Sequence, residues 1–225
     1  MPSDDRSQHK ERLRQRYLQN GLAGFHDYEV LELILSYAQV RRDTKAIAKR
    51  LVKRFGSLTA VMTAPAQQLT EVEGVGERSA VLIKLFRDAG EYHMREHILG
   101  RDALSSAAEV RDYLVRTAKG RLHEEFRVIY LNTQYIVVDE ETISEGTVKE
   151  AKVYLRKVCE HALIRHASVV IVAHNHPSGS LKPTQDDINL TYRLQQALKL
   201  IDVKLLDHLV VTGEGYFSFA SENLL

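Results

Sequence analysis

Two histidines and two aspartates give the string AHNHPSGSLKPTQDD the strongest chemical character in the sequence. His174 and His176 close a continuous apolar run, SVVIVAHNH, which predicts a buried strand. Positions i and i+2 of a strand face the same side, so both imidazoles can point at one ion. Because imidazole nitrogen is a preferred ligand of zinc, the pair indicates a metal site.

A turn and a helix follow the histidines and can supply a third ligand. Pro177, Ser178 and Gly179 predict a turn that returns the next helix to the end of the strand. Either Asp186 or Asp187, in the first turn of that helix, then completes the set. Two histidines, one carboxylate and an open fourth position are typical of a catalytic zinc rather than a structural one.

The same residues also have a purely structural interpretation. Isolated histidine pairs are common on protein surfaces. Thr184 and Asp187 fit a capping box, in which a hydroxyl and a carboxylate satisfy backbone N–H groups at the start of a helix. The spacing of these residues, taken alone, leaves this alternative open.

The complete string resembles the JAMM motif of MPN-type metalloproteases, in which HxH, seven residues, Ser, two residues and Asp follow one another. Thr184 stands in the place of the serine, so a hydroxyl is kept. HNHPSG, the pair Gly146–Thr147 and the ending LLDHLVVTGEGYFSFA resemble the RadC family, over nearly the whole chain. The resemblance implies that Asp187 is the metal ligand and that Asp186 is only its neighbour on the helix. It implies Zn²⁺ held by three ligands: His174, His176 and Asp187.

JAMM enzymes also use an upstream glutamate, at the start of a strand, as general base. Glu124 precedes the apolar run FRVIYLN, at a distance from the histidines similar to that in other JAMM proteins. Glu125 is the second candidate, and Glu145, which lies much nearer the histidines in sequence, is the third. We predict that Glu124 takes a proton from a metal-activated water that attacks an amide carbonyl. We also predict that Thr184 donates a hydrogen bond to the tetrahedral oxyanion.

The elements that must position these residues change character along the chain. The first hundred residues predict only helices, over 26–38, 44–55, 58–63, 66–72 and 77–98, with residues 1–20 as a tail or a first helix. After the linker expected at 100–106, the sequence predicts helices over 107–119, 149–166 and 184–201. It predicts strands over 126–132, 135–143, 168–176, 203–213 and 216–220.

This pattern predicts an all-α domain over residues 1–100 and an α/β domain over residues 101–225. The resemblance implies an MPN-like, deaminase-like α/β/α fold with a central mixed sheet for the second domain. Asp207 and His208 interrupt its apolar run LLDHLVV. They could orient metal ligands, but such a pair more often ends a strand, and we leave both out of the predicted site.

The segment LTEVEGVGERSAVLIKLF in the first domain resembles a helix-hairpin-helix motif. Gly74 and Gly76 permit a tight turn, and the start of the next helix offers N–H groups to a phosphate. Seven basic residues between Arg41 and Arg54 face one acid in the sequence. We therefore expect sequence-independent DNA binding by residues 1–100. Glutamates flank the hairpin and oppose a phosphate, so docking of another protein is the alternative.

Composition narrows the remaining choices. The only cysteine, Cys159, excludes an internal disulfide framework and the ligand set of zinc deaminases, which needs PCxxC. The N-terminus lacks the apolar core of a signal peptide, and no apolar run reaches the roughly 20 residues of a membrane span. We expect a cytoplasmic protein that does not enter membranes. A formal net charge of +1 identifies no partner.

Together, the residues and the resemblance predict a zinc-dependent metallohydrolase of peptidase or isopeptidase type. The alternative is a DNA-associated repair or recombination accessory protein whose metal site is structural or silent. The sequence names neither the substrate nor the oligomeric state.

Overall fold

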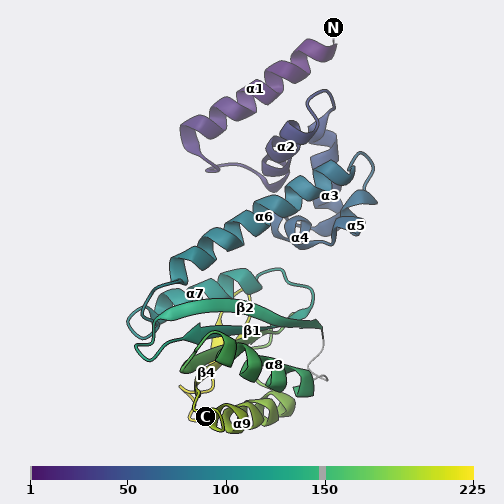
Figure 1. Cartoon of the computed structure of the whole chain (residues 1–225). Helices are drawn as coiled ribbons and strands as arrows, with labels where there is room; N and C mark the ends of the chain where they lie inside the picture. The colour runs from purple at the N-terminus through teal and green to yellow at the C-terminus, as the bar shows by residue number, and fades with distance from the viewer. Residues whose placement is uncertain (1, 147–150) are drawn as a thin grey trace. The chain divides into compact units, whose positions relative to one another are not determined.

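The structure, a computed structural model, describes residues 2–146 and 151–225 and forms two compact units, Met1–Gly90 and Glu91–Leu225 (Figure 1). In its described residues the first unit is helical. Its helices are α1 (Pro2–Asn20), α2 (Asp27–Ala38), α3 (Thr44–Phe55), α4 (Leu58–Thr63), α5 (Ala66–Thr70) and most of α6 (Glu77–Ile98). Residues 1–20, which the sequence left as either a tail or a first helix, thus form a helix from Pro2 to Asn20.

Apolar side chains at helical spacing build the core of the first unit. Leu31 and Leu35 of α2 pack with Ile47 and Leu51 of α3, and all four are buried. Asp43 begins α3, since its carboxylate accepts hydrogen bonds from the backbone N–H groups of the two residues after Thr44. The core thus follows the periodicity of the sequence.

The hairpin between α5 and α6 depends on one of its two glycines. Gly74 has a φ of 91°, a conformation that L side chains rarely adopt. A Cβ at this position would also lie 3.0 Å from the Ile47 side chain. Gly76 has no positive φ, and a Cβ there would meet nothing within 4 Å. The turn therefore requires glycine at position 74.

The second unit begins with the last turns of α6, at Glu91. It contains α7 (Ala107–Ala118), β1 (Glu124–Leu131), β2 (Val137–Gly146), α8 (Ala151–Ile164), β3 (Val169–Asn175), α9 (Gln185–Lys199), β4 (Lys204–Val211) and β5 (Tyr216–Ser218). The strand order is β2-β1-β3-β4-β5. β3 and β4 are parallel and the other pairs are antiparallel. The predicted fold class, helices followed by a mixed sheet with helices, is confirmed.

Each face of this sheet carries its own core, because alternate residues of a strand point to opposite sides. Val170 and Val172 of β3 pack with residues of α8 and α9. Ile171 and Ala173 pack on the other face with α7 and the end of α6. Even-numbered positions of β3 therefore face α9, and this parity decides where the histidines point.

The end of α6 belongs to the second unit. Ile98 is buried in the core on the α7 face, and Met94 packs against that core. The compact unit consequently begins at Glu91, before the linker expected at residues 100–106. In residues 2–146 and 151–225, no helix combines the length and apolar character needed to cross a bilayer.

Candidate metal centre

His174 and His176 lie where β3 ends, on the face covered by α9. His174 continues the parity of Val170 and Val172, and Phe126 of β1 stands opposite it in the register. Both histidines are buried. The predicted strand geometry therefore holds, with both imidazoles on the same side of the sheet.

Asp187 reaches the same place from the first turn of α9 and is 1% exposed. Thr184 is the N-cap: its hydroxyl accepts from Asp187 N–H (3.2 Å), and the Asp187 carboxylate accepts from Thr184 N–H (2.7 Å). Asp186 is exposed on the helix surface. The capping box and the metal interpretation of Asp187 are thus compatible, since one carboxylate serves both.

Three ligand atoms converge between these side chains. Nε2 of His174 lies 3.0 Å from Nε2 of His176 and 3.2 Å from Oδ1 of Asp187. Nε2 of His176 lies 3.5 Å from Oδ2 of Asp187. Ligand atoms of the three residues all lie within 4.8 Å of one another, so this buried group could bind a metal.

Hydrogen bonds at the far side of each ring fix the position of its proton. Nδ1 of His176 lies 2.8 Å from the Ser180 carbonyl, which can only accept, so Nδ1 carries the proton. Nδ1 of His174 lies 2.8 Å from Nε2 of His208. Nδ1 of His208 lies 2.5 Å from the Thr191 hydroxyl, which donates to the Asp187 carbonyl.

The Thr191 hydroxyl donates its only proton to the Asp187 carbonyl. It can therefore only accept a hydrogen bond from Nδ1–H of His208. Complete burial, assisted by His174, holds the pKa of His208 well below its usual range, so this ring is neutral. Its Nε2 therefore accepts from Nδ1–H of His174. When both rings are neutral, each of the two histidines therefore presents an unprotonated Nε2 to the same point.

This donor set fits a tetrahedral zinc. Zinc–nitrogen bonds of about 2.0–2.1 Å at a tetrahedral angle place neighbouring ligand atoms about 3.3 Å apart, close to the three separations given above. Oδ1 of Asp187 is buried without a hydrogen-bond partner. Acceptors this close repel one another unless a cation or a proton lies between them. Two nitrogens and one carboxylate oxygen are ligands that zinc accepts.

The charges of the group shift its ionisation in opposite senses. Burial would raise the pKa of Asp187, but hydrogen bonds from His174 and His176 outweigh it, and the carboxyl titrates far below its usual range. The hydrogen bond with Asp187 raises the pKa of His176, the negative charge of Glu124 acts in the same direction, and burial opposes both. Asp187 is therefore the permanent anion of the group.

Strand parity separates the candidates for the general base. Glu124 shares the face of Phe126, the face of the metal group, and continuing the register places it level with His176. Glu125 points to the opposite face, where it is buried in ion pairs. Glu145 lies opposite Glu125 in the register, but its side chain is outside the described residues. The assignment of Glu124 stays a prediction, with the geometry on its side.

His208 is the residue that sequence reasoning missed. It is buried within β4 and contacts His174, whereas Asp207 accepts hydrogen bonds from Ser218 and Ala220 and so holds β5 and the residues after it against β4. The available signal was a histidine inside the apolar run LLDHLVV, on the strand parallel to β3. Of the predicted RadC signature, Thr147 lies outside the described residues.

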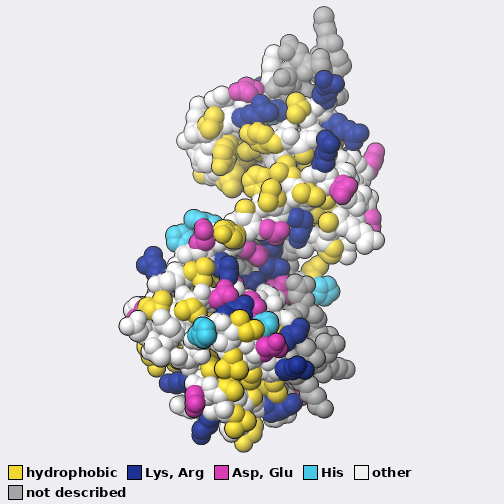
Figure 2. All heavy atoms as spheres, viewed as in Figure 1, with side chains coloured by type: hydrophobic (Ala, Val, Ile, Leu, Met, Phe, Trp, Pro, Cys, Tyr) yellow, Lys and Arg dark blue, Asp and Glu magenta, His cyan; other side chains and the backbone are white. Residues whose placement is uncertain are grey.

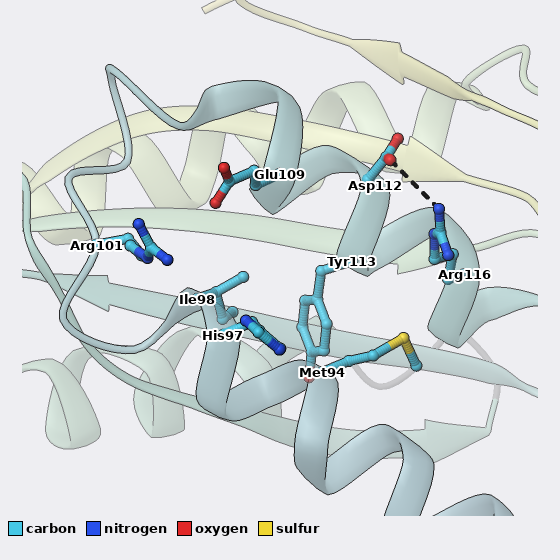
Figure 3. A pocket seen from close by; sticks show the side chains of 8 residues that line it. All are labelled: Met94, His97, Ile98, Arg101, Glu109, Asp112, Tyr113 and Arg116. Carbon is cyan, nitrogen blue, oxygen red and sulfur yellow. Dashed lines mark ion pairs between the residues drawn. The ribbon is translucent and has the colours of Figure 1, made fainter.

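The Thr184 hydroxyl donates to Oδ2 of Asp187 at 2.7 Å, in addition to capping α9. Its predicted donation to an oxyanion would require that proton to change acceptor, and this role stays a prediction. A separate hollow of about 290 Å³ lies between α6 and α7, on the other face of the sheet (Figure 3). Its lining carries both signs of charge, including the ion pair of Asp112 with Arg116, and we assign it no function.

Comparison with known proteins agrees with this arrangement. Residues 104–224 match the family model described as RadC-like JAB domain, and residues 5–81 match the one described as UPF0758 N-terminal. A UPF0758 protein of Ruegeria pomeroyi is 38% identical over the full length of both chains, and one of Fusobacterium nucleatum is 33% identical over both. A UPF0758 protein of Rhodobacter capsulatus is 40% identical over 95% of this chain and all of its own. The predicted resemblance is confirmed.

Proposed function

Since the chain belongs to the UPF0758 family and carries a RadC-like JAB domain, we propose that it is a zinc-dependent hydrolase of peptidase or isopeptidase type. The observation that supports this most is the buried convergence of His174, His176 and Asp187, with Glu124 on the same face. A site that only stabilises the fold has no need of a carboxylate beside its ligands. The substrate would contain an amide bond.

Each residue then has a separate task. His174, His176 and Asp187 would hold the metal, which when bound supplies a Lewis acid and lowers the pKa of a coordinated water to about 7. Glu124 accepts a proton from the attacking water at its carboxylate and returns it to the leaving amine. Thr184 holds the Asp187 carboxylate, and we retain its donation to the oxyanion as part of the proposal.

Full-length protein loaded with zinc should be assayed against peptide and isopeptide libraries. The proposal is supported if His174→Ala abolishes cleavage. It is also supported if wild-type protein loses cleavage when zinc is removed and regains it when zinc is added back. The Glu124→Gln variant should bind zinc normally and cleave slowly. If no library gives zinc-dependent cleavage and His174→Ala unfolds the second unit, the metal is structural and the hydrolase is excluded.

The second candidate, a nucleic-acid-associated accessory function, is favoured by a hollow of about 540 Å³ in the first unit. Arg41, Arg42 and Arg78 line it together with Gly74 and the start of α6. Exposed guanidinium groups that line a hollow beside the first turn of the 22-residue α6 suit a phosphate. On the face of the second unit that Figure 2 shows, basic and acidic side chains are intermixed, and we propose phosphate binding for the first unit.

Two of the basic residues that the sequence offered for this role are already engaged. Arg50 donates to the Glu73 carbonyl at 3.1 and 2.9 Å, and Arg54 pairs with Glu71. They brace the hairpin against α3. The phosphate-binding proposal therefore rests on the three arginines of the hollow.

A further inference from the structure

Asn175, between the two histidines, joins β3 to the beginning of β1. Its Oδ1 accepts from the backbone N–H of Glu125 at 2.7 Å, and its Nδ2 donates to the backbone carbonyl of His123 at 3.0 Å. These two peptide groups flank Glu124. One buried carboxamide therefore forms hydrogen bonds with the backbone on both sides of the predicted base.

The two Asn175 hydrogen bonds lie where the regular backbone pairing of β1 with β3 ends. Backbone pairing of β1 with β3 ends at Phe126 and His174, and the N–H of His176 donates instead to the Val211 carbonyl of β4 at 3.0 Å. Beyond this rung, the described hydrogen bonds between the two strands come from the Asn175 side chain. Only a short carboxamide offers an acceptor and a donor in this geometry, because Asp lacks the donor and Ala lacks both.

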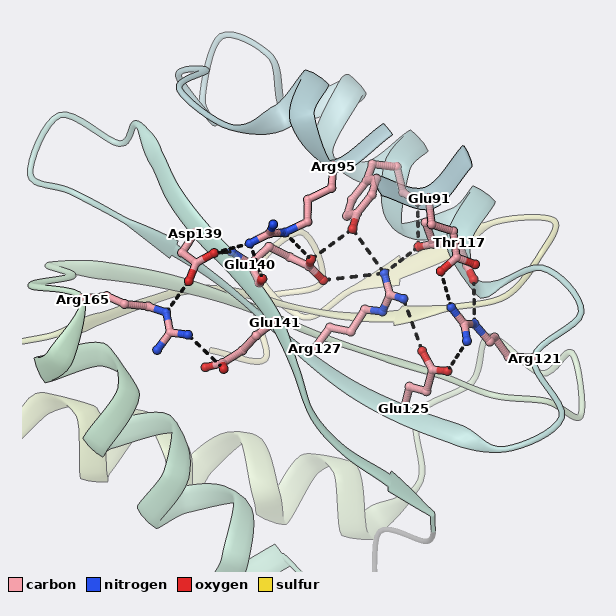
Figure 4. Close-up of polar contacts among 11 residues, drawn as sticks. Glu91, Arg95, Thr117, Arg121, Glu125, Arg127, Asp139, Glu140, Glu141 and Arg165 are labelled. Carbon is pink, nitrogen blue, oxygen red and sulfur yellow. Dashed lines mark hydrogen bonds and ion pairs between the residues drawn. The ribbon is translucent and has the colours of Figure 1, made fainter. Parts of the chain in front are cut away.

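A second restraint decides which way the next residue points. The Glu125 carboxylate lies 2.8 Å from Nη1 of Arg121 and 3.3 Å from Nη2 of Arg127, and Arg127 also donates to the Thr117 hydroxyl at 2.9 Å (Figure 4). These contacts hold Glu125 on the α7 face. Since neighbouring strand residues alternate, Glu124 must face the metal group.

We propose that Asn175 is a positioning residue: its carboxamide sets the place of the Glu124 carboxylate relative to His176 and the metal. This inference rests on the proposed function, in which Glu124 is the base. It adds that the residue between the metal ligands fixes the base through the backbone of β1. A residue that only stabilised the strand end would affect folding without affecting the environment of the metal.

The test uses full-length protein with Co²⁺ in place of zinc, so that the visible spectrum reports the metal environment. The pH midpoint of the spectral change is measured in wild type, Glu124→Gln, Asn175→Ala and the double variant. A carboxylate beside the metal disfavours loss of a proton there, so Glu124→Gln should lower the midpoint, by about one pH unit. Asn175→Ala, which releases Glu124, should shift it in the same direction, with no further shift in the double variant.

Asn132→Ala is the matched control. Asn132 lies at the other end of β1, and its side chain also binds backbone, accepting from Gln134 N–H at 2.9 Å and Ile136 N–H at 3.0 Å. It should lower thermal stability and leave the midpoint unchanged. If Asn175→Ala does not fold, Asn175→Asp keeps the shape and the acceptor but loses the donor to His123.

Asp adds a charge of its own, whose effect on the midpoint would persist in the Glu124→Gln background. The positioning effect would vanish there, so the two are separable. A midpoint that moves in Glu124→Gln but not in the Asn175 variants overturns the positioning role and leaves the proposed function intact. A midpoint that does not move in Glu124→Gln removes Glu124 as the base, and the role of Asn175 falls with it.

Discussion

His208 contacts the predicted metal ligand His174 from inside the sheet, with 2.8 Å between His208 Nε2 and His174 Nδ1. The His208 ring is fully buried and stacks on Phe219, with ring centres 4.8 Å apart. Its other nitrogen is held by Thr191, on the helix that also supplies Asp187. Two of the three ligands are thus linked through one neutral imidazole, and the link keeps Nε2 of His174 free for a metal.

We expect His208→Phe to weaken zinc binding by about 10–100-fold, as is typical when the hydrogen-bond partner of a metal-binding histidine is lost. The aromatic ring fills the same space, but Nδ1 of His174 loses its acceptor and the ring can turn. Competition with a fluorescent zinc chelator measures the change. Phe219→Leu is the control, since it disturbs the packing of the His208 ring without removing the hydrogen bond. An unchanged zinc affinity in His208→Phe would show that the hydrogen bond to His208 is not needed to keep His174 in its Nδ1–H tautomer.

The metal assignment predicts one zinc per chain, measured by elemental analysis of protein purified without added metal. His174→Ala and His176→Ala should lose it, because each removes one of three protein ligands. Asp187→Asn should lose it as well, whereas Asp186→Asn, at an exposed position, should keep it. His97→Ala, on the exposed surface of α6, is the matched histidine control. Wild-type zinc content in His176→Ala would refute the ligand set.

The ionisation of the group predicts opposite responses of metal-free and zinc-loaded protein to pH. A raised pKa of His176 adds stability that is fully present below the unfolded-state value of about 6.5 and disappears as pH rises through the folded value. Asp187, with its lowered pKa, stays ionised throughout this window. Zinc needs the deprotonated imidazole, so its stabilising effect grows with pH.

The melting temperature of metal-free protein should therefore fall between about pH 6 and 8, while the gap between zinc-loaded and metal-free protein widens. Differential scanning calorimetry at three pH values measures both. In metal-free His176→Ala this component of the pH dependence should vanish. A gap that narrows as pH rises would contradict the prediction.

Glu124 and Glu125 are adjacent in sequence but should respond differently to the same substitution. Glu124→Gln removes a proton acceptor on the metal face and should lower turnover by about 10²–10⁴-fold with little change in stability. Glu125→Gln leaves Arg121 and Arg127 with fewer buried partners and should lower the free energy of unfolding by about 1–3 kcal/mol. Urea denaturation and turnover of a library-derived substrate separate the two. Equal losses of stability in the two variants would mean that Glu124 and Glu125 do not have different roles on opposite faces of the sheet.

This pair also shows what the sequence could and could not predict. Apolar periodicity located the strands and helices, and the HxH spacing predicted the shared face of His174 and His176, because both depend on local geometry. Whether Glu124 or Glu125 faces the metal depends on the register between β1 and β3, which is a long-range property. His208 was missed for the same reason, since only the parallel pairing of β3 with β4 brings it to His174. The half-buried arginines around Glu125 left no pattern in the sequence.

The arginines of the first unit give the last prediction, which concerns nucleic acid. If phosphates bind the hollow lined by Arg41, Arg42 and Arg78, affinity for duplex DNA should fall steeply with salt, since each neutralised phosphate releases a counterion. The double variant Arg41→Ala, Arg42→Ala should weaken binding equally for all sequences and reduce the slope of log affinity against log salt by about two. Arg193→Ala, an exposed arginine on α9, should change neither quantity.

Fluorescence anisotropy with full-length protein and labelled duplexes of two unrelated sequences, at several salt concentrations, gives both quantities. Retained affinity and slope in the double arginine variant would move any DNA contact away from the hollow. Absence of binding at low salt would instead favour the hairpin as a site where another protein docks, because a phosphate site built from exposed guanidinium groups is strongest when salt is lowest.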